Sequence, residues 1–403
     1  MARCGDGLAV DSDLLRAAET ATRQALEPLS GRTPDLVLVF ACGTDPSEVS
    51  AALERSAELS GAATVVGCSG VGVIGSGRGV ELESAVSVWA AVLPGVRLRS
   101  FHLEVLRSSE AIAVVGMPVQ QYDDQVVVVL ADPYSFPIDA FVEQAAEALP
   151  GLPLTGGLAS GLLGAGSTRL LVDGVVHDRG AVGVVLGGPV TARTVVSQGC
   201  RPVGPAMTVT ASDGNVLFGL AGVPALTKLE QVIAALPPED QALASAGLQL
   251  GIAMDEYVDR HSHGDFLVRG IIGADTERGA LMVGDVVEVG RTVRFQVRDA
   301  DTATADLTAL LGSFRAARSL DPVDGALLFT CNGRGAALFP SADHDVQLVQ
   351  RVLGASGVAG FFAAGEIGPV GGRSHVHGFT ASVLAFGSVP DGPPAGLVTG
   401  PGA

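Results

Sequence analysis

The chain has 403 residues, of which 47% are hydrophobic and only 4% are aromatic. This apolar content is too high for a disordered chain, and it suffices for two or more domains with cores built from Val, Leu and Ala. The formal net charge of −18 argues against nucleic acids and anionic membrane surfaces as partners.

The sequence predicts a cytoplasmic protein. No apolar run approaches the ~20 residues that a membrane-spanning helix needs, and the N-terminal residues lack the apolar core of a signal peptide. The five cysteines, at positions 4, 42, 68, 200 and 331, are scattered and form no Cys-x-x-Cys pair. This pattern is typical of a reducing compartment and does not predict a zinc site.

The first 92 residues predict a helix followed by a strand–helix–strand–strand unit. The helical pattern covers 11–29 and begins after an Asp/Ser cap. The unit consists of a strand over 35–41, a helix over 45–59, a strand over 64–67 and a strand over 84–92. Its first strand is a continuous apolar run, which indicates a strand covered on both faces. Its second strand breaks into small residues at Cys68 and Ser69.

The same order of elements recurs twice. The second unit has strands over 125–131, 154–157 and 180–186 and a helix over 138–149, and the third unit lies within 327–385. The second strand of each unit ends in small or polar residues, and we take Cys68, Gly157 and Glu366 as the corresponding positions. We therefore expect an α+β fold in which tandem strand–helix–strand–strand repeats form two sheet-based modules.

The region between the second and third units sets the predicted domain boundary. Its pattern indicates paired strands within 192–219, further strands over 266–300 and a helix over 302–319. A Gly-Val-Pro sequence at 222–224 marks the boundary. The predicted domains are 1–222 with two repeats, 223–388 with the third repeat, and a flexible tail rich in Pro and Gly over 389–403.

The third unit carries the candidate site. Cys331, Asn332 and Arg334 follow its first strand, and Glu366 follows its second strand. If these strands are neighbours, the four side chains gather at one edge of the sheet. A carboxylate and a guanidinium are costly to bury there unless they pair or face a ligand.

The order of the motifs resembles that of the FIST-domain family, with an N-terminal and a C-terminal FIST module in tandem. The matching segments are 34–40, 66–69, 154–157 and 199–204 in the first module and 266–269, 331–335 and 360–369 in the second. The resemblance covers roughly residues 10–388. It implies a ligand-sensing domain for intracellular signalling that binds small molecules such as amino acids. Because no kinase, methyl-accepting or cyclase module follows, it also implies that a separate signalling protein carries the output.

The predicted ligand site combines the three strand breaks. Its glycines let backbone N–H groups approach a ligand closely. Arg334 would hold a ligand carboxylate with two hydrogen bonds and Glu366 would hold an amino group, so we expect an amino acid or a similar small metabolite. The structural alternative is that the glycines only allow sharp turns and that Arg334 and Glu366 pair with each other. The residues of the site are Cys68, Ser69, Gly156, Gly157, Cys331, Asn332, Arg334, Gly365, Glu366 and His377.

Two other functions stay open. Cys331, Glu366 and His377 contain the parts of a nucleophile–base–orienter set for acyl transfer or hydrolysis, although a cysteine at a strand end is most often a small buried hydrophobe. His375 and His377 would face the same side of a strand, where one imidazole could bind a haem iron. Some members of the family resemble haem-binding nitric-oxide sensors. Haem is therefore the alternative cofactor; otherwise we expect none, and no metal.

Overall fold

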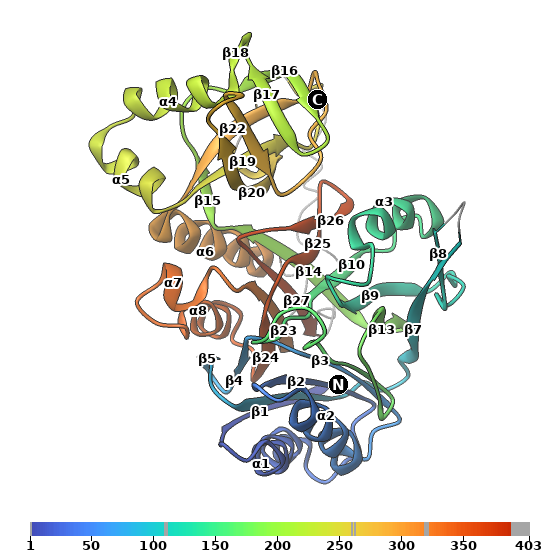
Figure 1. Cartoon of the computed structure of the whole chain (residues 1–403). Coiled ribbons are helices and arrows are strands. Elements are labelled where there is room, and N and C mark those ends of the chain that lie inside the picture. The colour runs from blue at the N-terminus through green and yellow to red at the C-terminus, as the bar shows by residue number, and fades with distance from the viewer. Residues whose placement is uncertain (1, 109–111, 259–260, 262, 318–321, 388–403) are drawn as a thin grey trace, which may run out of the picture.

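The structure is a computed structural model of the chain, and it describes residues 2–108, 112–258, 261, 263–317 and 322–387 (Figure 1). Helices and strands are mixed along the chain, which confirms the predicted α+β class. The tail predicted for 389–403 lies outside the described residues. Within the described ranges, every helix is too short or too polar to cross a lipid bilayer.

The first sheet forms around two parallel strands, β2 (Leu36–Cys42) and β3 (Thr64–Ser69), which α2 (Pro46–Ser60) connects. The helix begins after Asp45, whose carboxylate accepts a hydrogen bond from the Ser47 N–H at 2.7 Å. The antiparallel strands β6 (Ala85–Val92) and β1 (Arg3–Val10) extend the sheet on the other side of β2. Every side chain of β2 is buried because α1 (Leu14–Leu26) and α2 cover the outer face of the sheet.

The second and third sheets repeat this arrangement. The second contains β7 (Arg97–Arg107), β9 (Asp124–Ala131), α3 (Ile138–Ala148), β10 (Leu154–Leu158) and β13 (Ala181–Gly187). The third contains β14 (Thr191–Gln198), α6 (Ala300–Ala316), β23 (Val323–Cys331), α7 (Gly335–Leu338), α8 (His344–Leu353), β24 (Gly357–Ala363) and β27 (Thr380–Gly387). The strand orders are β3-β2-β6-β1, β10-β9-β13-β7 and β24-β23-β27-β14. Within these core strands and helices, each sheet follows the chain order strand, helix, strand, strand.

The three sheets exchange hairpins. In each unit, the chain between the second strand and the closing strand forms a hairpin. This hairpin pairs with a strand in the sheet of another unit. The hairpins are β4–β5 (Gly72–Gly75 and Arg78–Glu81) on β24, β11–β12 (Leu170–Val172 and Val175–His177) on β3, and β25–β26 (Glu366–Val370 and Arg373–His377) on β10. A further strand, β8 (Ile112–Val115), pairs with β7. The exchange locks the three units together.

The strand register shows that Glu366 does not correspond to Cys68 and Gly157, as the sequence had indicated. In each unit a glycine of the second strand lies opposite the first strand so closely that an added Cβ would meet a carbonyl oxygen; these glycines are Gly67, Gly156 and Gly360. Cys68 and Gly157 therefore correspond, but the third member of the set is Phe361. Glu366 lies five residues farther along, in the exchanged hairpin.

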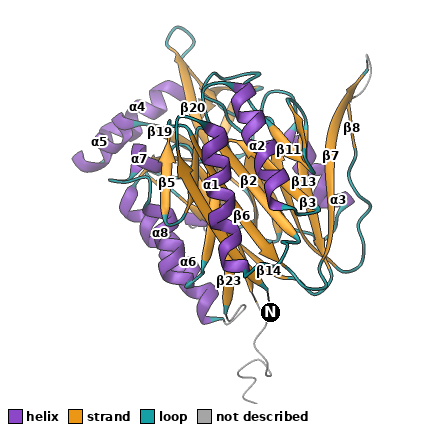
Figure 2. Ribbon diagram, turned by 90° about the horizontal axis from the view of Figure 1, so that it is seen from below, coloured by secondary structure: helices purple, strands orange, loops and turns teal. Residues whose placement is uncertain are grey.

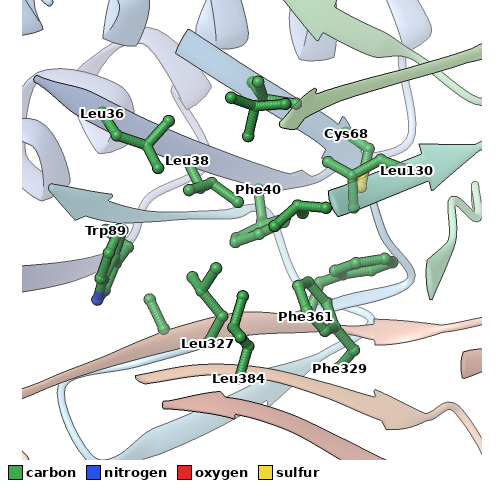
Figure 3. Close-up of a cluster of buried hydrophobic side chains, with 14 of the residues drawn as sticks. Leu36, Leu38, Phe40, Cys68, Trp89, Leu130, Leu327, Phe329, Phe361 and Leu384 are labelled. Atoms are coloured by element: carbon green, nitrogen blue, oxygen red, sulfur yellow. The ribbon is translucent and has the colours of Figure 1, made fainter. Parts of the chain in front are cut away.

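The inner faces of the three sheets meet in one hydrophobic core (Figure 3). Phe40 and Phe361 stack with ring centroids 5.1 Å apart, and Phe329 packs edge-on against Phe361 at 5.9 Å. The helices cover the outer faces: α1 and α2 lie on the first sheet, as Figure 2 shows, α3 lies on the second, and α6 and α8 lie on the third. Both faces of each central strand are thus apolar, which explains the continuous hydrophobic runs in the sequence.

A fourth sheet occupies the chain between β14 and α6. Its strands are β15 (Cys200–Pro202), β16 (Met207–Asp213), β17 (Val216–Leu220), β18 (Val223–Pro224), β19 (Leu248–Ala253), β20 (Phe266–Asp275), β21 (Ala280–Val283) and β22 (Thr292–Arg298). Because β19 pairs with both β20 and β22, the order β22-β16-β17-β21-β20-β19 closes on itself, and we call this sheet the barrel. Helices α4 (Ala225–Ala235) and α5 (Pro238–Ala246) pack against its core. Residue 222, the predicted boundary, lies between β17 and β18, which pair with each other.

Candidate functional site

The end of β23 leads into a buried ion pair. Arg334 directly precedes α7, and Asp345 lies in the first turn of α8. Arg334 Nε donates a hydrogen bond to Asp345 Oδ2 at 2.8 Å, and Arg334 Nη2 donates to Oδ1 at 2.9 Å. Arg334 is 0% exposed and Asp345 is 4% exposed. Thr330 Oγ1 also donates to Asp345 Oδ2, at 2.6 Å.

This pair changes the predicted role of Arg334. Desolvation opposes ionisation of Asp345, but the charge of Arg334 and the hydrogen bonds from His344, Arg334 and Thr330 outweigh it, so the pKa of Asp345 falls below its ordinary value. Both partners are therefore ionised near neutral pH. The prediction that Arg334 holds a ligand carboxylate with two hydrogen bonds is wrong in this respect, because two of its three nitrogens bind Asp345. Arg334 also does not pair with Glu366: only its Nη1 remains, and this atom is buried without a hydrogen-bond partner among the described residues.

Glu366 opens β25 and is fully buried. Its Oε2 accepts hydrogen bonds from the Thr380 N–H at 3.0 Å and from Thr380 Oγ1 at 2.8 Å. In the described part of the chain, Oε1 has no partner. Desolvation raises the pKa of Glu366 to about 8, although the hydrogen bonds from Thr380, the charge of Arg334 and a hydrogen bond with the Cys331 thiol act in the opposite direction. Near neutral pH the carboxyl is therefore mostly protonated.

Cys331 and Asn332 lie beside these two residues at the carboxyl end of β23. The Asn332 N–H donates to the Ala363 carbonyl at 2.9 Å, which ties the end of β23 to the end of β24. Asn332 Oδ1 is a further buried oxygen without a partner in the ranges that the structure covers. Desolvation and the nearby charge of Glu366 raise the pKa of Cys331 to about 12. Burial thus favours the protonated thiol, whereas a nucleophilic cysteine needs the thiolate.

A strained residue links the parts of the site. Phe379 has a φ of 62°, in the left-handed region that non-glycine residues rarely adopt. Its ring lies against Gly333, and the guanidinium carbon of Arg298 is 5.6 Å from the ring centroid. Arg298 also donates from Nη2 to the Gly333 carbonyl at 2.5 Å. Phe379 therefore directs the Thr380 N–H toward Glu366 while it joins the site to the barrel.

Buried polar atoms without partners concentrate at this junction. Of the fourteen such side-chain atoms within the described ranges, nine belong to the third unit and the barrel. One of them, on Asp324, lies at the start of β23, and the other eight belong to Gln198, Gln249, Gln296, Arg298, Asn332, Arg334 and Glu366. An unpaired buried polar atom is costly and therefore rare in native proteins. Such a concentration at one place points to hydrogen-bonding partners supplied from outside the chain.

The other predicted site residues make contacts within the protein. Cys68 is 0% exposed in the central core, and burial raises its pKa well above the ordinary value. Ser69 Oγ donates to the Ser160 carbonyl at 2.8 Å and accepts from the Arg169 N–H at 2.9 Å. Among the glycines, Gly156 lies against the Val129 carbonyl of β9, Gly157 is the register partner of Glu366, and Gly365 lies against Leu158. A role of these residues in ligand binding stays a prediction.

His377 does not fit a haem site. His377 is the register partner of Glu366 on β26, and its Nε2 lies 2.9 Å from the Gly368 carbonyl oxygen. It is 3% exposed, and burial lowers its pKa to about 3. The ring of His375 packs edge-on against the ring of His377, with the two ring centroids 5.9 Å apart. An axial ligand needs an imidazole nitrogen that faces an apolar space large enough for a porphyrin, whereas His377 is enclosed and held by a carbonyl. The position of His377 therefore does not support an axial contact with haem.

Sequence reasoning missed several residues of the site. Asp345 was not expected because it lies in an amphipathic run, where an acidic residue near a helix start usually serves as a cap. Gln198, Gln249, Gln296 and Arg298 were missed because they alternate with apolar residues in strands and read as solvent-facing positions. An arginine and an aspartate that tertiary structure brings together leave no spacing signal.

Two family models match consecutive parts of the chain. The family model of the FIST N domain matches residues 35–223, and that of the FIST C domain matches residues 225–369. The chain therefore belongs to the FIST-domain family, as the order of its motifs predicted. FIST domains are sensory domains of signal transduction.

Relatives from mycobacteria match 95% of the chain. An uncharacterized protein of Mycobacterium tuberculosis, strain H37Rv, is 42% identical over 388 residues, which cover 95% of this chain and 99% of the relative. An uncharacterized protein of Mycobacterium bovis is 39% identical over 384 residues, which cover 95% and 98%. Among solved structures, a cyanuric acid hydrolase from A. caulinodans aligns over 96% of this chain and 100% of its own with 10% identity and a TM-score of 0.28.

Alkylation of Cys331 separates a binding site from a cysteine-dependent enzyme. With a pKa of about 12 for Cys331, roughly 10⁻⁵ of the thiol is ionised at pH 7, so we expect slow labelling by iodoacetamide whose rate keeps rising through pH 9. Peptide mass spectrometry measures the rate, and the unfolded protein gives the reference for a free thiol. Rapid stoichiometric labelling at pH 7 that is lost in His377→Ala would favour the acyl-transfer alternative.

Proposed function

We propose that this chain is a small-molecule-binding sensor whose ligand is an amino acid or a similar small metabolite. The observation that carries the proposal is the group of three buried polar atoms, Asn332 Oδ1, Arg334 Nη1 and Glu366 Oε1, for which the described residues provide no hydrogen-bond partner. They come from two neighbouring segments of the third unit. Membership of a sensory family supports the same conclusion.

The chemistry of these atoms suits a zwitterion. Arg334 Nη1 is a charged donor, because Asp345 keeps the guanidinium ionised, and it would bind a carboxylate oxygen. Glu366 Oε1 and Asn332 Oδ1 are acceptors, and they would bind an ammonium group. A compact molecule that carries both groups on one carbon atom satisfies all three. We also propose that a separate signalling protein reads the ligand-bound state, since sensing requires an output.

Ligand-induced thermal stabilisation tests the proposal. A ligand at one hundred times its dissociation constant should raise the stability by about 2.7 kcal/mol, and Glu366→Gln should remove most of this shift because it loses the anionic acceptor. Below pH 8 the ammonium group must displace the proton of Glu366, whose pKa is about 8. The association constant should therefore rise by up to about tenfold per pH unit from pH 6 to pH 8 in the unmodified protein and stay flat in Glu366→Gln. A thermal-shift assay measures the stabilisation, and calorimetric titration from pH 6 to pH 8 measures the association constant.

The matched control is Glu48→Gln, because Glu48 is exposed on α2 in a different unit. This variant should bind as the unmodified protein does. A panel of the common amino acids and related metabolites without any thermal shift would refute the proposal. Equal shifts in Glu366→Gln and in the unmodified protein would show that the ligand binds elsewhere.

A further inference from the structure

A pair of glutamines on the barrel has buried amide groups without partners. Gln249 on β19 and Gln296 on β22 are register partners, so their side chains lie next to each other on the same face of the sheet. Gln296 is 0% exposed and Gln249 is 7% exposed. Neither polar atom of the Gln296 amide, nor Gln249 Oε1, has a hydrogen-bond partner among the described residues. The third-unit site does not account for these three atoms.

The two glutamines face the third unit and not the core of the barrel. On β22, Val293, Phe295 and Val297 belong to the barrel core, so the alternate residues Gln296 and Arg298 lie on the opposite face. That face packs against the third unit, because Arg298 donates to the Gly333 carbonyl and Gln198 Nε2 donates to the Phe266 carbonyl at 2.9 Å. Figure 1 shows β19, β20 and β22 above β25 and β26.

Arg298 connects the strand that carries Gln296 to the third unit. Gln296 precedes Arg298 by two residues on β22, a separation of about 7 Å along the strand. Arg298 contacts the segment that contains Asn332 and Arg334. On the neighbouring strand Cys200 pairs with Arg298, and Gly199 lies so close to Arg334 Nη1 that an added Cβ would be 2.7 Å away. Through Arg298 and Gly199, strands β22 and β15 thus connect the glutamine pair to the segment that contains Arg334.

We propose that the ligand is an α-amino acid whose side chain ends in a carboxamide, as in glutamine or asparagine, and that Gln249 and Gln296 bind this amide. The inference rests on the proposed function, which places the amino and carboxylate groups at Glu366 and Arg334. A carboxamide both donates and accepts, so it can satisfy Gln296 Nε2 and the two glutamine oxygens together. A carboxylate offers no donor to these oxygens, and an apolar side chain leaves all three atoms unpaired.

Comparison of near-isosteric ligands tests the inference. We expect glutamine or asparagine to bind at least tenfold more tightly than its carboxylate analogue (glutamate or aspartate) and than its apolar analogue (methionine or leucine) in calorimetric titrations at pH 8. Gln296→Leu should remove this preference while it leaves the affinity for alanine within about twofold, and Gln249→Leu should reduce the preference. Gln125→Leu, at an exposed position on β9, is the matched control and should keep it.

The outcomes separate the two proposals. Equal binding of the amide ligand and its apolar analogue, or a preference that survives in Gln296→Leu, overturns the carboxamide inference and leaves the amino-acid sensor intact. Binding of no amino acid overturns both. Replacing an unpaired buried amide by leucine removes a cost to folding, so we expect Gln296→Leu to melt at or above the temperature of the unmodified protein. That measurement shows that a lost preference reflects the site and not unfolding.

Discussion

Replacing Asp345 by asparagine should destabilise the protein by about 3–5 kcal/mol, because it leaves the buried Arg334 guanidinium without its counter-charge. Arg334 is 0% exposed, and two of its nitrogens bind Asp345. The desolvation cost of the cation would remain after its attraction to the anion is lost. Urea denaturation at pH 7 measures the change in the free energy of unfolding.

Two controls make this result specific. Asp301→Asn, at an exposed position in the first turn of α6, should change the stability by less than about 1 kcal/mol. The double variant Arg334→Met with Asp345→Leu removes both charges and should recover most of the loss. The contribution of Asp345 to the free energy of unfolding should be constant above its ordinary pKa, near 3.8. It should decline at lower pH, as the carboxylate takes up a proton. A loss below about 1 kcal/mol in Asp345→Asn would mean that water reaches Arg334.

Replacing Gly360 by alanine should cost about 3 kcal/mol or more. An added Cβ would lie 1.7 Å from the Leu328 carbonyl oxygen on the neighbouring parallel strand. Neither strand can move away, because both lie between the central core and the helices on the outer face. Overpacking of a rigid core typically costs 1–3 kcal/mol, and a contact with backbone leaves little room for relaxation. Thermal and urea denaturation give the size of the effect.

Gly312→Ala is the matched control for this substitution. Gly312 lies in α6, and an added Cβ would meet nothing within 4 Å. Alanine stabilises an exposed helix by up to about 1 kcal/mol relative to glycine, so the control should become more stable while Gly360→Ala loses stability. Equal tolerance of both substitutions would mean that β23 and β24 are less tightly packed than the register indicates.

The exchanged hairpins explain why the candidate site lies where it does. Glu366 belongs to the third unit in sequence, but its strand pairs with β10 of the second unit. The first residues of β25 therefore lie between two sheets, beside the end of β23 and against the segment that enters β27. This position encloses the carboxyl completely, and the desolvation that raises its pKa follows from that enclosure.

The barrel adds a second side to this site. In the proposed site, the outer face of the barrel would contribute Arg298 and the two glutamines, and the third unit would contribute Asn332, Arg334 and Glu366. A ligand bound between the two parts would stabilise their contact, which is a physical basis for a sensor: binding energy changes the preferred arrangement of two modules. The family assignment gives the sensory class, and the unpaired atoms support the location of the ligand.

Local patterns in the sequence determined the secondary structure and the order of the units. The apolar run over 35–41 predicts β2 because both faces of that strand are covered, and the helical period over 302–319 predicts α6 to within a few residues. The small residues at 67–69 and 156–157 marked the ends of second strands, since only glycine fits against the neighbouring carbonyl there. These signals depend on neighbours in the chain or on one adjoining strand, and the sequence contains them directly.

Only the tertiary structure decided which distant residues meet. Nothing in the spacing indicates that the hairpin with Glu366 joins the sheet of the second unit, or that Gln249 and Gln296 lie on a buried face of a closed barrel. The partner of Arg334 is Asp345 and not Glu366, because α8 places that carboxylate beside the guanidinium and leaves Glu366 to Thr380. Pairing of charges and enclosure of polar atoms depend on distances between elements, and a linear pattern of residues does not contain those distances.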